Sequence, residues 1–389
     1  MSSPLGVLVR AIKLPLSHRD IRQLAALNCC AHPSGARKSL LERYLDFAYA
    51  FVLRNELSPL YYAQQLDLKG RNVRREYLSY EEFRSVRDAR NGMRITASRY
   101  NYGCLLRDKL LFERYFSGAG IPVATSLGEI QSRNKATFQG TTESDFIAWG
   151  QTNHQAADLF LKPRFGIKGK GVFAVRFLGD EVEVNGKCVQ PGDFVDRLKD
   201  RYLVQNRILQ HPTLSELHTH SLNTVRIITY RSTEAPEVFL SYLRIACNGE
   251  IADNNANARV IVRVDAQSGR CQETGYAITS DPAIKTTTHP DSHVAFSDVV
   301  IPFWDECLSL VKRAHAWLPE MFSIGWDVAL TPNGPVLLEG NDDWGATTAM
   351  WAMPEFVEAF RRLHAHSDAS PTGAPDGGTG GVPLRDHGL

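Results

Sequence analysis

A glycine-rich loop between two apolar runs constrains this chain more than any other feature. Residues 162–172 read KPRFGIKGKGV, in which three glycines are interspersed with basic side chains. Only glycine lets successive backbone N–H groups approach an anion closely at positive φ, and the lysines add fixed positive charge. Residues 172–175 read as a strand, so this is not a Walker loop that opens a helix. The stretch predicts a phosphate-binding loop between two strands, although taken alone it fits a basic β-turn equally well.

A hairpin far downstream supplies a cluster of oxygen ligands. Residues 324–330 alternate between apolar and smaller or polar side chains, residues 332–334 read as a turn, and an apolar run returns to Glu339. This pattern places Asp327 roughly opposite Glu339, and Asn341 shares a face with Glu339. Two carboxylates and an amide oxygen suit Mg²⁺. The alternative is a solvated hairpin face, but a carboxylate that ends a buried strand needs a cation or another partner.

Three further segments follow in a consistent chain order. They are an amphipathic helix that starts after Asp108 and leads to residues 118–123, a strand at 203–208, and a strand at 222–229 that contains Arg226. All five segments together resemble the ATP-grasp superfamily, in which an Asp and a Glu-x-Asn pair bridge ATP to two magnesium ions. The resemblance implies that residues 203–208 join two lobes and read the adenine edge through their backbone, and that Arg226 contacts phosphate.

The resemblance also implies a fold and a set of site residues. The fold is α+β, with two α+β lobes gripping ATP and a mainly helical N-terminal segment. The residues expected to bind ATP are Lys109, Lys162, Gly166, Gly169, Lys170, Gly171, Val172, Gln205, Asn206 and Ile208. The residues expected to bind Mg²⁺ are Asp327, Glu339 and Asn341, and those expected to stabilise charge during the reaction are Arg226, Asn254 and Arg259.

The residues of several motifs resemble those of one group within the superfamily, the sugar-transfer-associated ATP-grasp proteins. These proteins are often encoded near polysaccharide or glycosyl-transfer functions. Residues 210–212, 221–226, 253–254 and 324–327 carry this narrower resemblance. One departure follows Asn254, where residues 255–259 stand in place of a small glycine pair. The departure lies on the acceptor side of the expected site.

Three functions are compatible with these residues. The leading one is a carboxylate-amine ligase of polysaccharide or natural-product biosynthesis, in which a carboxylate attacks the γ-phosphoryl group and an amine then displaces phosphate, giving an amide, ADP and phosphate. A phosphotransferase would use a sugar or other hydroxyl as acceptor, with Asp253 or His211 as general base. A non-catalytic nucleotide-binding partner of a glycosyltransferase comes last, because a degenerate site is expected to lose a metal ligand first.

The chain divides by composition into four parts. Residues 1–95 read mostly as helices, including an apolar repeat at 40–53; residues 96–204 form a first lobe and residues 205–365 a second. Residues 366–389, rich in Gly, Pro, Ser and Asp, predict a disordered tail. Two roles stay open for the N-terminal segment, namely closing the acceptor side of the cleft or pairing two copies into a homodimer.

Charge and cysteine content exclude several classes of protein. Lys and Arg total 44 against 43 Asp and Glu, so no global basic field draws the chain to nucleic acid or to an anionic membrane. No run of about 18 apolar residues predicts a membrane span, and no secretion signal is evident. The seven cysteines, without a Cys-x-x-Cys pair, predict reduced thiols in a cytoplasmic protein. The partners expected from the ligase reaction are a small-molecule carboxylate and a small-molecule amine.

Two other kinds of site are disfavoured by local spacing. His218 and His220 would share a face of a strand, with His211 nearby, but no cysteine or carboxylate with zinc spacing lies beside them. No Gly-x-Ser-x-Gly elbow predicts a hydrolase. Arg244 lies among apolar residues and needs an anionic partner, either a substrate phosphate or an internal carboxylate.

Overall fold

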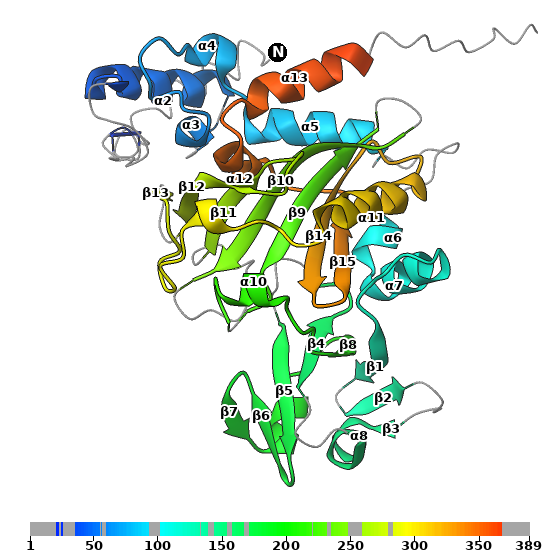
Figure 1. The fold of residues 1–389 in the computed structure, drawn as a ribbon. Helices are drawn as coiled ribbons and strands as arrows, with labels where there is room; N and C mark the ends of the chain where they lie inside the picture. The colour runs from blue at the N-terminus through cyan, green and yellow to red at the C-terminus, as the bar shows by residue number, and fades with distance from the viewer. Residues whose placement is uncertain are drawn as a thin grey trace, which may run out of the picture.

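The structure is a computed structural model of the 389-residue chain. It describes residues 21–22, 25, 36–54, 56, 60–92, 102–132, 134–138, 144–153, 158–166, 171–219, 221–231, 235–247, 259–278 and 283–367. Two antiparallel sheets dominate the fold (Figure 1). None of the helices in these ranges is both long and apolar enough to cross a membrane.

The first sheet has eight strands in the order β3-β2-β1-β8-β4-β5-β6-β7. The strands are β1 (Ser126–Ser132), β2 (Lys135–Phe138), β3 (Ser144–Asp145), β4 (Leu159–Pro163), β5 (Phe173–Leu178), β6 (Glu181–Val184), β7 (Lys187–Val189) and β8 (Tyr202–Asn206). Helices α8 (Phe146–Asn153) and α9 (Pro191–Val195) bury their aromatic residues in this sheet's own core, around Phe146, Phe177 and Phe194. Strands β4 and β5 are the two strands expected on either side of the loop that follows Lys162.

The second sheet has seven strands in the order β13-β12-β11-β10-β9-β14-β15. The strands are β9 (Thr224–Tyr230), β10 (Glu237–Ala246), β11 (Arg259–Val264), β12 (Cys271–Ile278), β13 (Ile284–Thr286), β14 (Ser323–Thr331) and β15 (Gly334–Asn341). Strands β14 and β15 are the expected hairpin, and Asp327 lies directly opposite Glu339 in their register. The α10 helix (Pro212–Ser215) leads from the first sheet to the second.

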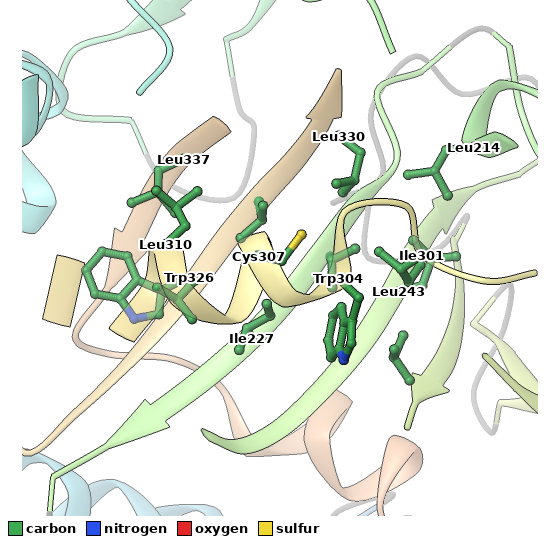
Figure 2. Close-up of a cluster of buried hydrophobic side chains, with 14 of the residues drawn as sticks. Leu214, Ile227, Leu243, Ile301, Trp304, Cys307, Leu310, Trp326, Leu330 and Leu337 are labelled. Carbon is green, nitrogen blue, oxygen red and sulfur yellow. The ribbon is translucent and has the colours of Figure 1, made fainter. Parts of the chain in front are cut away.

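Side chains on the second sheet alternate between two cores because successive residues of a strand point to opposite faces. One core lies between the sheet and α11 (Trp304–Ala316), and Figure 2 shows Ile227, Leu243 and Trp326 in it. Residues of α6 (Cys104–Arg107) and α7 (Lys109–Gly118) belong to the same core. Ile228 and Tyr242 face the opposite side. The helices that cover that side are α3 (Leu60–Ala63), α5 (Tyr80–Arg90), α12 (Ala346–Ala352) and α13 (Phe356–Ser367). Helices α2 (Leu40–Arg54) and α4 (Val73–Glu76) lie further from the sheet. The short η2 (Phe296–Asp298) packs on β12.

The helical N-terminal segment and the α+β class are confirmed for the described residues, and α2 matches the apolar repeat expected at 40–53. The expected boundary at 204 and 205 falls inside β8, which continues to Asn206. Helix α13 extends to Ser367, so the first two residues of the expected tail are helical. Residues 368–389 of that tail lie outside the described residues.

The residue that caps the C-terminus of α5 forms hydrogen bonds to both strands at the open end of the hairpin that carries Asp327 and Glu339. This residue, Asn91, donates from Nδ2 to the carbonyl oxygens of Ser323 (2.9 Å) and Asp342 (2.8 Å), and its Oδ1 accepts from the Ser323 N–H (2.8 Å). Ser323 begins β14, and Asp342 follows the last residue of β15. The N-terminal segment is therefore part of the scaffold of the second sheet.

We expect Asn91→Ala to lower the free energy of unfolding by about 1–3 kcal/mol or more, because it leaves buried backbone groups without partners. Urea denaturation followed by tryptophan fluorescence measures the change. Asn333→Ala, at the exposed turn of the same hairpin, is the control and should stay close to wild type. Equal midpoints for the two variants would show that α5 does not hold the hairpin.

Candidate functional site

A cleft of about 820 Å³ is lined by residues of both sheets. Strands β4, β5 and β8 contribute one wall, and strands β9, β10, β14 and β15 contribute the other. The segment 207–222, which connects the two sheets, provides a third side. The cleft brings together segments that are far apart in the chain.

Two lysines from different elements enter this cleft beside a carboxylate. Lys109 is the first residue of α7, and its Nζ donates to the carbonyl oxygen of Gly166 at 2.5 Å. Lys162 lies on β4 and Glu339 on β15, and the Glu339 carboxylate interacts electrostatically with both ammonium groups. Burial lowers the pKa of Lys162 to about 8, with Glu339 opposing and Lys109 adding to the effect. The two ammonium groups are suited to binding an anionic ligand, which would favour their charged forms.

The start of α7 is tied to the glycine-rich loop. The Asp108 carboxylate caps the helix by accepting from the N–H groups of Leu110 (3.0 Å) and Leu111 (3.2 Å). The same carboxylate accepts from Arg164 Nε (2.8 Å) and Nη2 (2.6 Å). Asp108 therefore positions Lys109 relative to the loop that follows Lys162.

Asp327 is the most buried charge of the cleft, with 2% of its surface exposed. Arg226 donates to it from Nε (2.5 Å) and Nη2 (3.0 Å), and Arg244 Nη2 lies 3.0 Å from Oδ1. Burial alone would raise the pKa of Asp327, but the two guanidinium groups hold it well below its usual range. Thr224 Oγ1 accepts from Arg244 Nε (3.0 Å) and Nη2 (2.7 Å), which fixes that guanidinium.

Glu339 stands opposite Asp327 and behaves differently. Burial raises the pKa of Glu339, and the neighbouring Asp327 carboxylate raises it further, while Lys109 partly offsets the rise. Two acidic groups in one place disfavour a second negative charge unless a cation lies between them. The pair is therefore the candidate metal centre. Asn341 adjoins it on β15, and its Nδ2 donates to the carbonyl oxygen of Gly325 at 3.2 Å, which leaves the amide oxygen as its metal-binding end.

The structure places most of the expected site residues around this cleft. Those lining it are Lys109, Lys162, Gly166, Val172, Gln205, Asn206, Ile208, Asp327 and Glu339. Gln205 is buried, and its Nε2 donates to the carbonyl oxygen of Ala124 at 3.1 Å. Gly171 has φ +74°, and a Cβ there would lie 3.2 Å from Pro163 Cγ, so the loop needs glycine at this position. The expected Gly169, Lys170 and Asn254 lie outside the described residues.

Four expected residues are described but do not line the cleft, namely Gly171, Arg226, Arg259 and Asn341. Arg226 is 8% exposed and is engaged with Asp327, so it reaches the site only through that carboxylate. Arg259 donates from Nη2 to Thr348 Oγ1 at 3.0 Å. Asn341 is the last residue of β15, two positions after Glu339. Of the two arginines that contact Asp327, Arg244 lines the cleft, and its place inside an apolar strand was its only signal in the sequence.

Sequence patterns also missed a charged group at the outer end of the cleft. Asp158 accepts from Arg176 Nε (2.8 Å) and forms ion pairs with Arg176 (2.5 Å) and Arg207 (3.4 Å). All three residues line the cleft. Because their side chains are more than one third exposed, these pairs contribute little to stability.

The family model of sugar-transfer-associated ATP-grasp proteins matches residues 94–359, well over half of the chain. The chain belongs to this family. The ATP-grasp fold expected from the sequence is thereby confirmed, with the matched region beginning after the N-terminal helices and covering both sheets. None of the curated proteins matches the chain.

Several solved structures resemble this ATP-grasp chain at low identity. D-alanyl-alanine synthetase A from Vibrio cholerae is 12% identical with a TM-score of 0.40, over 68% of this chain and 65% of that one. VanG D-Ala:D-Ser ligase from Enterococcus faecalis is 14% identical with a TM-score of 0.40, over 67% and 61%. An ADP complex of N5-carboxyaminoimidazole ribonucleotide synthetase is 12% identical with a TM-score of 0.36, over 61% of this chain and 45% of that one, less than half its length. At such identities the likeness concerns the fold alone.

Proposed function

We propose that the chain is an ATP-dependent ligase that joins a carboxylate to an amine, releasing ADP and phosphate. The observation that carries the proposal is the convergence of Lys109, Lys162, Arg244 and the Asp327–Glu339 pair in one cleft. Membership of an ATP-grasp family supports ATP as the nucleotide. The combination of cations and paired acidic groups fits a triphosphate with its metal better than any neutral ligand.

The donor set of the metal centre fits magnesium. Asp327, Glu339 and Asn341 offer only oxygen ligands, which Mg²⁺ prefers. The raised pKa of Glu339 supports this assignment, since a cation beside it would favour its charged form. Bound Mg²⁺ would neutralise phosphate charge during transfer.

The remaining cleft residues would bind and orient the nucleotide. Lys109 and Lys162 are placed to hold phosphate oxygens, and Arg244, fixed by Thr224 and Asp327, is placed to stabilise charge that develops during transfer. Arg226 would act as a positioning residue for Asp327. Gln205, Asn206 and Ile208 form the part of the wall proposed to contact the adenine.

The position of His211 favours the ligase over the phosphotransferase, because this candidate base does not line the cleft. A hydroxyl acceptor needs a general base, whereas a carboxylate acceptor is already a nucleophile. His211 does not line the cleft, and its Nδ1 accepts from the Thr213 N–H at 3.3 Å as the cap of α10. The other candidate base, Asp253, lies outside the described residues.

The proposal predicts that hydroxylamine will trap an acyl-phosphate. The enzyme, ATP and Mg²⁺ would be incubated with a panel of amino acids and sugar acids plus hydroxylamine, and hydroxamate would be measured alongside ADP. We expect one carboxylate class to yield hydroxamate and ADP in equal amounts, with none formed by Glu339→Gln. A phosphorylated alcohol without hydroxamate would favour the phosphotransferase. Formation of AMP would contradict both functions.

A further inference from the structure

A second cluster of metal-ligating side chains lies away from the Asp327–Glu339 pair. His218, His289 and Asp291 each present one ligand atom, and these atoms lie within 4.8 Å of one another. His218 Nδ1 is 3.6 Å from Asp291 Oδ2, and the two imidazole centroids are 5.9 Å apart. His218 follows α10, whereas the other two residues lie between β13 and η2. None of the three lines the cleft.

The orientation of His289 is set by the backbone. Its Nε2 lies 2.9 Å from the carbonyl oxygen of Ala246, and because a carbonyl can only accept, Nε2 carries the proton. Its Nδ1 is therefore the unprotonated nitrogen. This nitrogen accepts long hydrogen bonds from the N–H groups of Asp291 (3.3 Å) and Ser292 (3.4 Å), which a bound metal ion would replace. Donation of the other ring N–H to a carbonyl is the arrangement that orients metal-binding histidines.

The two imidazoles are buried, and the carboxylate is partly exposed. His289 has 0% of its surface exposed. His218 is 6% exposed, while the Asp291 side chain is 35% exposed and gives access from solvent. Two imidazoles and one carboxylate are ligands that Zn²⁺ accepts, with a water completing four-fold coordination.

We propose that His218, His289 and Asp291 bind one zinc ion. The ion would link the segment after α10 to the loop between β13 and η2. Thr219 and Ser221, next to His218, line the cleft, so the ion would brace the cleft wall that they form. The sequence disfavoured zinc because no suitable ligand lies close to His218 along the chain. His289 and Asp291 lie some 70 residues further on, so local spacing could not reveal them.

Zinc binding by the full chain tests this site. Protein stripped with a chelator would be titrated with Zn²⁺ at neutral pH against a chromophoric competitor. We expect one tight equivalent for wild type, weakened at least about 100-fold in His218→Gln and Asp291→Asn, because even groups that merely support a ligand are worth about 10–100-fold. His293→Asn is the matched control, since this exposed neighbour has φ +62°, which Asn tolerates, and it should bind zinc as wild type does.

Thermal unfolding provides an independent readout. One equivalent of Zn²⁺ should raise the midpoint of wild type and of His293→Asn but not that of Asp291→Asn. Asp291→Asn keeps the volume of a partly exposed side chain, so it tests the site even where His218→Gln does not fold. No tight equivalent in wild type, or equal zinc affinity in wild type and Asp291→Asn, would overturn the proposal and leave His218 and Asp291 as a simple ion pair.

Discussion

Replacing Glu339 by glutamine is expected to lower ATP turnover by about 100-fold or more while the protein stays folded. Glutamine keeps the volume of the side chain but removes the charge that the proposed Mg²⁺ site needs. The substitution keeps the shape of a side chain that is buried beside Asp327, so we expect the fold to survive. Release of ADP measured at saturating Mg²⁺ reports turnover, and thermal unfolding reports the fold.

Glu183→Gln is the matched control for this prediction. Glu183 lies on β6 and lines the same cleft, but it lies away from Asp327 and is not a proposed ligand. We expect it to retain turnover within a few-fold of wild type. Turnover of Glu339→Gln in that same range would remove Glu339 from the metal centre.

Replacing Lys162 by methionine is expected to weaken ATP binding about 10- to 100-fold at neutral pH, the usual worth of a hydrogen bond to a charged group. The effect should depend on pH. Below the pKa of about 8 the ammonium is charged and attracts phosphate, and above it the group is neutral. ATP affinity of wild type should therefore fall as pH rises through 8, by up to about tenfold per unit.

Calorimetry across this pH range checks the prediction, because ATP binding near pH 8 should be accompanied by proton uptake in wild type. Lys162→Met should lose most of that uptake. Lys187→Met, on the exposed β7, is the control and should titrate like wild type. If Lys162→Met bound ATP with the affinity and pH profile of wild type, the phosphate site would lie elsewhere.

Much of the candidate site follows from local patterns. The hairpin that brings Asp327 near Glu339 could be predicted from its turn and the alternation of its strands, whereas the bulge between Asp327 and Val328, which sets Asp327 directly opposite Glu339, could not. The loop after Lys162 could be predicted because the positions of its glycines and the apolar runs on either side are local properties. These features concern residues close together in the chain.

The choice between arginines could not be predicted in the same way. Arg226 and Arg244 both lie within apolar strands, and each of them needs an anionic partner. The sequence therefore does not show which of the two enters the site. Pairing of β9 with both β10 and β14 places Asp327 within reach of both guanidinium groups, yet only Arg244 borders the cleft. That outcome depends on how the sheets pack, which no single strand encodes.

The sequence by itself determined the family, the α+β class, the helical N-terminal segment, and the loop and hairpin that carry the lysines and carboxylates, because periodicity and turn residues act over a few positions. Only the tertiary structure decided that β8 lies between β1 and β4, that Asn91 holds the hairpin, and that His218 meets His289 and Asp291. These contacts join segments separated by tens to hundreds of residues. They arise because burying both faces of the sheets brings those segments together, which no local pattern specifies.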